Sequence, residues 1–173
     1  MSKLKPEANL SPAFNMDIFF TIYLIIISIS IIIGLVRLKK LDTPGKVLLL
    51  ILIITIISES IAEFYMSKYL KNNYPVYHIF NPVELFLFST IYYSEIKNNQ
   101  PKFYIKLVMI IAPLFAIFNA LFLQSVWEYN SNFLLLEFSA LISFSLLYFT
   151  QILNKKNILL LLKTLCSGLT AVL

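Results

Sequence analysis

Short polar stretches divide this sequence into long apolar blocks. Five blocks, at residues 18–36, 47–66, 76–96, 103–123 and 133–153, each approach the roughly 20 residues that a helix needs to cross a bilayer. The strands of a membrane barrel are about half as long and alternate apolar with polar residues, which these blocks do not. The pattern therefore predicts an all-α fold, a polytopic transmembrane helical bundle with five full spans.

Polar sequence precedes the first block, and a shorter apolar segment follows the last. Residues 1–17 are predicted to form a polar extracytoplasmic tail, and residues 18–173 a single transmembrane helical domain. The final segment, 158–173, would reach only about 24 Å as a helix, which makes it a partial sixth span. Because this segment ends on the apolar Leu173, we expect the native gene to encode further residues, as in a seven-helix protein.

The composition excludes most classes of soluble protein. Hydrophobic residues make up 59% of the 173 and charged residues only 13%, whereas a soluble domain carries about 25% charged residues. The net charge of +5 does not indicate nucleic-acid binding, because the basic residues lie beside the apolar blocks as membrane anchors do. Cys166 is the single cysteine, which excludes an intramolecular disulfide. The predicted partner is the lipid bilayer. The sequence leaves open whether the protein forms a homo-oligomer.

Basic residues are distributed unequally between the two sets of loops. Nine follow the first, third and fifth blocks, and four lie on the opposite side: Arg37, Lys39, Lys40, Lys46, Lys97, Lys102, Lys106, Lys155 and Lys156 against Lys3, Lys5, Lys68 and Lys71. Cytoplasmic loops are the ones enriched in Lys and Arg. The count therefore predicts a multi-pass protein with its N-terminus outside.

A few polar residues interrupt the apolar blocks, and they are the candidates for a site. An ionisable residue within a span costs about 2.5 to 3.5 kcal/mol on insertion scales, so it needs a partner or a function. Glu59 and Glu63 are four residues apart and share one helix face, and His78, Asn81 and Glu84 follow at intervals of three. The candidate ligand pocket consists of Glu59, Glu63, His78, Asn81, Glu84 and Glu137.

Depth in the membrane predicts how these residues pair. The second and third blocks are antiparallel neighbours, so Glu63 should face His78 and Glu59 should face Glu84 one layer deeper. Glu137 should lie at the level of the upper of these two layers. Two close carboxylates cannot both ionise in a low dielectric, so the deeper pair is expected to hold a proton. Such a pocket could bind a cationic or hydroxylated ligand, relay protons or coordinate a metal.

Two simpler interpretations remain open. The glutamates can serve only as polar contacts between helices. Asn81, Pro82 and Glu84 also have the pattern of a helix start, which would move His78 into an outer loop. A helix beginning at Pro82 would be too short to span, whereas one beginning near Pro75, capped by Asn73 or Tyr74, spans fully. The sequence therefore favours the longer helix with Pro82 inside it.

The stretch from Tyr77 to Leu85, with Tyr92 and Tyr93 after it, resembles a helix of small uncharacterised multi-pass proteins from Bacteroidetes-type bacteria. In those proteins the His-x-x-Asn-x-x-Glu pattern lies on the third of about seven helices. The resemblance covers about half the chain. It implies a protein of about seven helices and names no activity. The expected location is the inner membrane of a bacterium.

Function is predicted from the candidate pocket, because no familiar catalytic or nucleotide-binding motif occurs. The leading hypothesis is a sensor or ligand-binding membrane module with a polar pocket that opens outward to a small molecule or lipid. A lipid-modifying membrane enzyme, either metal-dependent or not, is the alternative, and a small transporter is the third. No cofactor is predicted, and catalytic residues and metal ligands stay unassigned.

Overall fold

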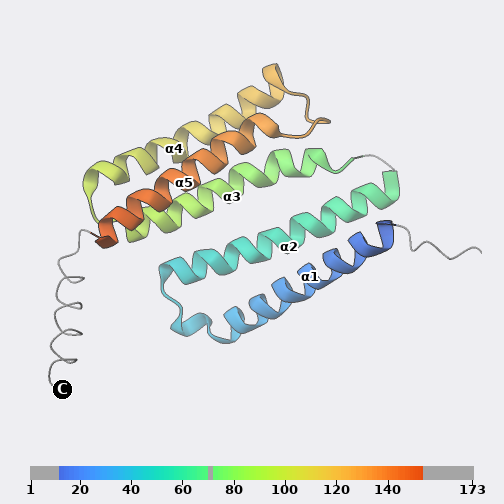
Figure 1. The fold of residues 1–173 in the computed structure, drawn as a ribbon, viewed down its shortest axis with the longest axis horizontal. Helices are drawn as coiled ribbons and strands as arrows, with labels where there is room; N and C mark the ends of the chain where they lie inside the picture. Colours follow the sequence, from blue (N-terminus) through green and yellow to red (C-terminus); the bar gives the residue numbers. More distant parts are fainter. Residues whose placement is uncertain (1–11, 70–71, 154–173) are drawn as a thin grey trace, which may run out of the picture.

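Helices account for the regular structure of the described residues, 12–69 and 72–153 of a computed structural model (Figure 1). The α-helices are α1 (Pro12–Val36), α2 (Thr43–Tyr69), α3 (Tyr74–Glu95), α4 (Asn99–Phe118) and α5 (Ser131–Leu153). A short 3-10 helix, Leu38–Lys40, precedes α2, and a π-helical turn, Asn119–Leu123, continues α4. This part of the chain contains no strand, which confirms the all-α prediction.

Among the described residues, four helices are long and apolar enough to cross a membrane: Ile18–Val36, Thr43–Met66, Asn99–Leu123 and Ser131–Leu153. They contain four of the five predicted full spans. The remaining predicted span, 76–96, forms α3, whose 22 residues extend about 33 Å. His78, Asn81 and Glu84 make α3 less apolar than the other four helices. Its hydropathy is therefore too low for it to count among the helices that could cross a membrane.

Two other sequence predictions concern the ends of the chain. The predicted partial span at residues 158–173 lies outside the described residues. At the other end, α1 begins at Pro12. Its first turns therefore include residues 12–17, which the sequence analysis assigned to the polar tail.

Helix α3 occupies the centre of the bundle. It packs against α2 on one side and against α4 and α5 on the other, while α1 packs against α2 (Figure 1). Two clusters of buried side chains join α3, α4 and α5: Leu85, Ala112 and Phe133 in one, and Ile96, Ile105 and Phe144 in the other. Polar residues on α3 are thereby held between two packed groups of helices.

The start of α3 decides between the two interpretations of its sequence. Asn73 is the N-cap residue, Pro75 lies in the first turn, and the helix continues through Pro82. Proline is favoured in a first turn because its missing N–H has no intrahelical partner there. The helix beginning near Pro75 is confirmed, and the helix beginning at Pro82 is wrong. His78 and Asn81 consequently lie on α3.

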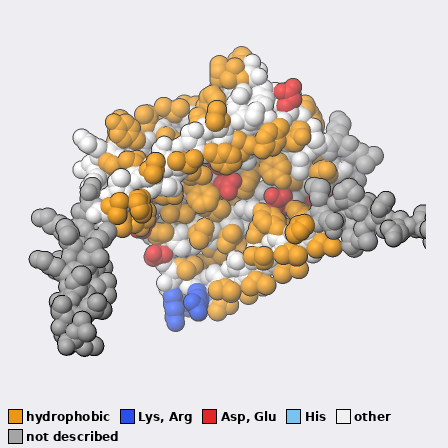
Figure 2. Space-filling view, in the orientation of Figure 1, with side chains coloured by type: hydrophobic (Ala, Val, Ile, Leu, Met, Phe, Trp, Pro, Cys, Tyr) orange, Lys and Arg blue, Asp and Glu red, His pale blue; other side chains and the backbone are white. Residues whose placement is uncertain are grey.

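The surface of the bundle is strongly apolar. Large side chains such as Phe19, Val36 and Ile79 are 72%, 82% and 73% exposed, which suits contact with lipid chains. Figure 2 shows hydrophobic side chains over most of the visible face and Lys and Arg gathered where α1 joins α2. We call the end with the α1–α2 and α3–α4 connections the basic end, and the opposite end the far end.

An asparagine network closes the far end between α4 and α5. Asn119, which is fully buried, donates from Nδ2 to Oδ1 of Asn130 at 3.1 Å and accepts at Oδ1 from Nδ2 of Asn132 at 3.0 Å. The N–H of Gln124 donates to the carbonyl oxygen of Asn119 at 2.8 Å, which forms the π-turn. These bonds fix the connection that leads into α5.

Candidate functional site

A cavity of about 740 Å³, which we call the glutamate cavity, lies between α1, α2 and the start of α3. Glu59 and Glu63 line it from α2, and Tyr77 lines it from α3. Figure 2 shows acidic side chains in the middle of the otherwise hydrophobic face, over α2 and α3. The volume falls within the range of roughly 300 to 1,000 Å³ that is typical of small-molecule sites.

The two carboxylates of this cavity are positioned by one helix face. Glu63 follows Glu59 by four residues, so it lies one turn closer to the far end on the same side of α2. The hydroxyl of Tyr77 donates to Oε2 of Glu59 at 3.0 Å, across the α2–α3 interface. Glu59 is half-buried and Glu63 is exposed. Of the six residues predicted for the pocket, Glu59 and Glu63 line this cavity.

Aromatic side chains form much of the remaining wall. Phe20 and Tyr23 line the cavity from α1, with their ring centroids 6.3 Å apart, and Tyr77 lines it from α3. Aromatic rings carry negative charge on their faces and attract cations, including quaternary ammonium groups. Rings and carboxylates together favour a ligand that is both apolar and positively charged.

Two further predicted residues lie behind the cavity, toward α5. Glu84 is half-buried on α3 and interacts electrostatically with Glu59. Glu137 on α5 is only 3% exposed, interacts electrostatically with Glu84, and its Oε2 has no hydrogen-bond partner. Glu59, Glu84 and Glu137 therefore lie on α2, α3 and α5, and α3 packs against both of the other helices.

Asn81 faces a different space, which we call the small cavity. This cavity of about 200 Å³ lies at the far end between α3 and α5. Asn81 and Asn130 line it, together with Tyr74, Tyr77, Tyr129 and Leu134. The two asparagines are 5% and 3% exposed, so the small cavity has a buried polar lining.

His78 contacts the α4–α5 connection. Its Nε2 lies 3.0 Å from the carbonyl oxygen of Glu128, in position to donate a hydrogen bond. Asn72 holds the same connection by donating from Nδ2 to the carbonyl oxygen of Trp127 at 2.8 Å. Among the described residues, no hydrogen bond or ion pair joins His78 to Glu63, the contact expected from their depth. His78 is instead placed to hold a loop.

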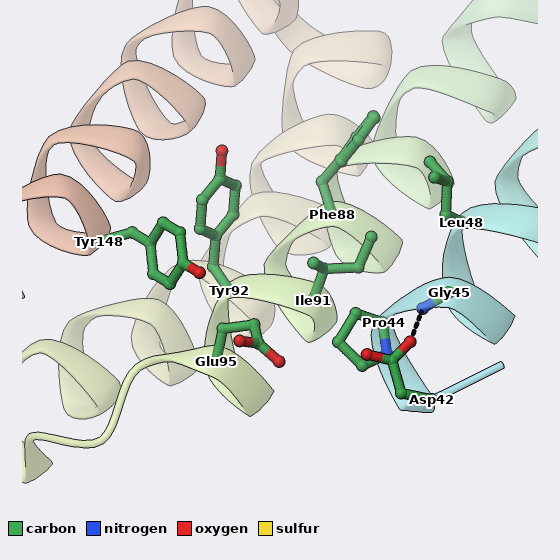
Figure 3. Close-up of a pocket in the computed structure, with 9 residues that line it drawn as sticks. All are labelled: Asp42, Pro44, Gly45, Leu48, Phe88, Ile91, Tyr92, Glu95 and Tyr148. Carbon is green, nitrogen blue, oxygen red and sulfur yellow. Dashed lines mark hydrogen bonds between the residues drawn. The ribbon is translucent and has the colours of Figure 1, made fainter. Parts of the chain in front are cut away.

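A groove of about 500 Å³ lies at the basic end, between the start of α2 and the ends of α3 and α5 (Figure 3). It also has two carboxylates, Asp42 and Glu95, beside apolar side chains that include Leu48 and Phe88. Asp42 already accepts the N–H of Gly45 at Oδ1, at 3.0 Å, which caps α2. One of the two carboxylates in this groove therefore has a structural partner.

Sequence reasoning missed the aromatic half of the glutamate cavity. The sequence analysis gave Tyr77 no place in the pocket, and Phe20 and Tyr23 belong to a block with no charged residue to mark one face. The spacing of Phe20 and Tyr23 by three residues places both rings on one side of α1. That spacing was the signal available in the sequence. It indicates a wall of the cavity once the position of α2 is known.

In the described part of the chain, no group of three His, Cys, Asp or Glu side chains could hold a metal ion. Comparisons with protein-family models, with curated proteins and with solved structures found no match. The resemblance to the Bacteroidetes-type proteins therefore stays a prediction.

Proposed function

We propose that this chain is a membrane-embedded binding module for an organic cation, which enters the glutamate cavity from outside the cell. The observation that carries the proposal is the pairing of Glu59 and Glu63 with an aromatic wall in one cavity. A carboxylate compensates the charge of the ligand, and aromatic faces contact its apolar surface. The module would act as a sensor or receptor for such a molecule.

The charge of the cavity lining favours a cation over an anion. None of the described residues that line it is Lys, Arg or His, and two are glutamates. Field lines concentrate in a negatively charged cavity with apolar walls, which raises the local concentration of cations. Tyr77 contributes a single donor, and that donor is already used by Glu59. An anionic ligand would find no compensating charge among the described lining residues.

The proposal includes a membrane arrangement in which α3 also crosses the bilayer, in addition to the four helices named above. Its two faces are covered by α2 and by α4 and α5, so its polar residues need not contact lipid. The basic end then lies in the cytoplasm and the far end outside, in the inner membrane of a bacterium. Glu63 and the glutamate cavity lie toward the far end, which supports entry of the ligand from outside.

The groove at the basic end is a weaker candidate for the same ligand. Asp42 is occupied in capping α2, and Lys97 follows Glu95 by two residues in the chain. Basic residues close to a groove reduce the attraction that its carboxylates exert on a cation. Glu95 therefore offers a matched control for the glutamates of the other cavity.

Equilibrium binding of radiolabelled tetraphenylphosphonium to the purified protein in lipid nanodiscs tests the proposal. The variant Glu59→Gln with Glu63→Gln should bind at least about tenfold more weakly than the native protein, a difference of about 1.4 kcal/mol. The control Glu95→Gln should bind as the native protein does. Binding that is equal in all three proteins would show only partition into lipid and would contradict the proposal.

A further inference from the structure

Glu137 is a buried carboxyl group, and one of its two oxygens has no hydrogen-bond partner among the described residues. It lies on the face of α5 that also carries Phe133 and Phe144, both buried against α3 and α4, and its Oε2 makes no hydrogen bond. An ionised carboxylate buried without compensation costs several kcal/mol, so the neutral, protonated form is strongly favoured in such a place. Glu84 on α3 interacts electrostatically with Glu137.

We propose that Glu84 and Glu137 form a proton-binding site that is coupled to the glutamate cavity, so that a cation bound there displaces a proton from this pair. The inference rests on the proposed function, because the cation is the ligand of that cavity. Glu59 connects the two sites: it lines the cavity and interacts electrostatically with Glu84. A positive charge beside Glu59 stabilises the ionised form of Glu84 as well.

Among the described residues, no basic group compensates the pair from the helices around it. On α3 the nearest other titratable side chain is His78, which contacts Glu128 instead. The stretch of α4 from 107 to 118 has no titratable residue, and α5 has only Tyr148, at the basic end. From α2 and α1 the groups that interact with Glu84 are Glu59 and Tyr23. Every charge that the described residues present to the pair is therefore negative when ionised.

The small cavity offers the displaced proton a route to the outside. Asn81 and Leu134 line this cavity, and each lies three residues before a member of the pair, Glu84 or Glu137. The cavity therefore lies about one helical turn from both carboxyl groups, on the side of the far end. Its volume of about 200 Å³ is enough for several waters with polar partners. The O–H bond of the carboxyl breaks, the proton passes to water there, and it ends on the buffer outside.

The direction of the pH dependence follows from this exchange. If binding of the cation releases a proton, mass action requires that the cation bind more tightly as the pH rises. The affinity can rise by at most about tenfold per pH unit for one proton released, and it levels off once the pair is already ionised. A pair that is not coupled to the cavity makes no contribution to the pH dependence of the affinity.

The test uses four proteins: the native protein, Glu84→Gln, Glu137→Gln and the control Glu95→Gln. For each, the affinity for tetraphenylphosphonium is measured from about pH 5 to about pH 8. Proton release on binding is measured with a pH indicator in weak buffer. The native protein and the control should release protons on binding and gain affinity with pH. Both pair variants should still bind, release fewer than about half as many protons, and change affinity less than about twofold per pH unit.

The outcomes separate this inference from the proposed function. Native protein that binds the cation without releasing protons would overturn the inference alone, as would pair variants with native proton release. Absence of saturable binding at every pH in the native protein would overturn the proposed function. Glutamine has the shape of a protonated glutamate, so Glu137→Gln should fold. If it does not, Glu84→Gln and the native measurement still decide.

Discussion

The hydroxyl of Tyr77 on α3 donates a hydrogen bond to Oε2 of Glu59 on α2, at 3.0 Å. Tyr77 also lines both the glutamate cavity and the small cavity, so its ring separates the two. One side chain thus fixes the orientation of a carboxylate in the proposed cation site and forms the wall toward the proposed proton site. The stability of the α2–α3 contact and the shape of both cavities depend on it.

Replacing Tyr77 by Phe should destabilise the protein. The change removes the donor to Glu59 and keeps the ring, and a hydrogen bond between membrane helices contributes about 0.6 to 2 kcal/mol. Thermal unfolding in detergent should show a lower midpoint for Tyr77→Phe. The control Tyr104→Phe removes a hydroxyl from a residue that is 60% exposed on α4, and it should leave the midpoint unchanged. Equal midpoints for the two variants would contradict the importance of the Tyr77–Glu59 bond.

Replacing Asn119 by Leu should lower the free energy of unfolding more than Tyr77→Phe does. Leucine has a similar volume, but Asn130 and Asn132 would each lose a partner, and a buried unsatisfied polar group costs about 1 to 3 kcal/mol. We expect a loss of at least about 2 kcal/mol in reversible unfolding, with Gln100→Leu on the exposed start of α4 as the control. A loss as small as that of the control would mean that the network does not hold the far end.

The contact of His78 with the carbonyl oxygen of Glu128 should control the α4–α5 connection. Trp127 is the single tryptophan of the chain, and its ring lies 6.5 Å from that of Tyr65, so its fluorescence reports on this connection. His78→Leu removes the donor and should shift the emission to longer wavelength as the loop gains contact with water. His78→Gln keeps a donor and should shift it less. Identical spectra for both variants and the native protein would refute the role of His78.

The orientation predicted from the basic residues can be tested by labelling. In a Cys166→Ser background, Ser131→Cys at the far end should react with a membrane-impermeant maleimide added to intact cells. Asn98→Cys at the basic end should react only after the membrane is opened. Both residues are exposed, so burial does not confound the comparison. The reverse pattern would place the basic end outside and would contradict the proposed direction of ligand entry.

Helix positions could be predicted from the sequence because the bilayer fixes the length of an apolar block. The beginning of α3 near Pro75 was predictable for the same reason, since a helix from Pro82 would be too short. The association of Glu59 with Glu63 followed from their spacing, because residues four apart share a helix face. These inferences need only the geometry of one helix.

Contacts between helices were less accessible, because they depend on how each helix is rotated about its axis. Depth alone placed His78 opposite Glu63, but α3 turns His78 toward the α4–α5 connection, where Glu128 offers a carbonyl oxygen. The rotation of α1, which brings Phe20 and Tyr23 to the cavity, also left no mark in a sequence that is apolar on all sides. Depth gives the level of a residue in the membrane and not its direction.

The position of a bound cation can be observed directly with tetraphenylarsonium, whose arsenic atom scatters X-rays anomalously. In crystals grown with it, the account predicts an anomalous peak inside the glutamate cavity, between the rings of α1 and the carboxylate of Glu59, and its loss in the variant Glu59→Gln with Glu63→Gln. A peak in the groove of Asp42 and Glu95, or no peak in the glutamate cavity at a saturating concentration, would contradict it.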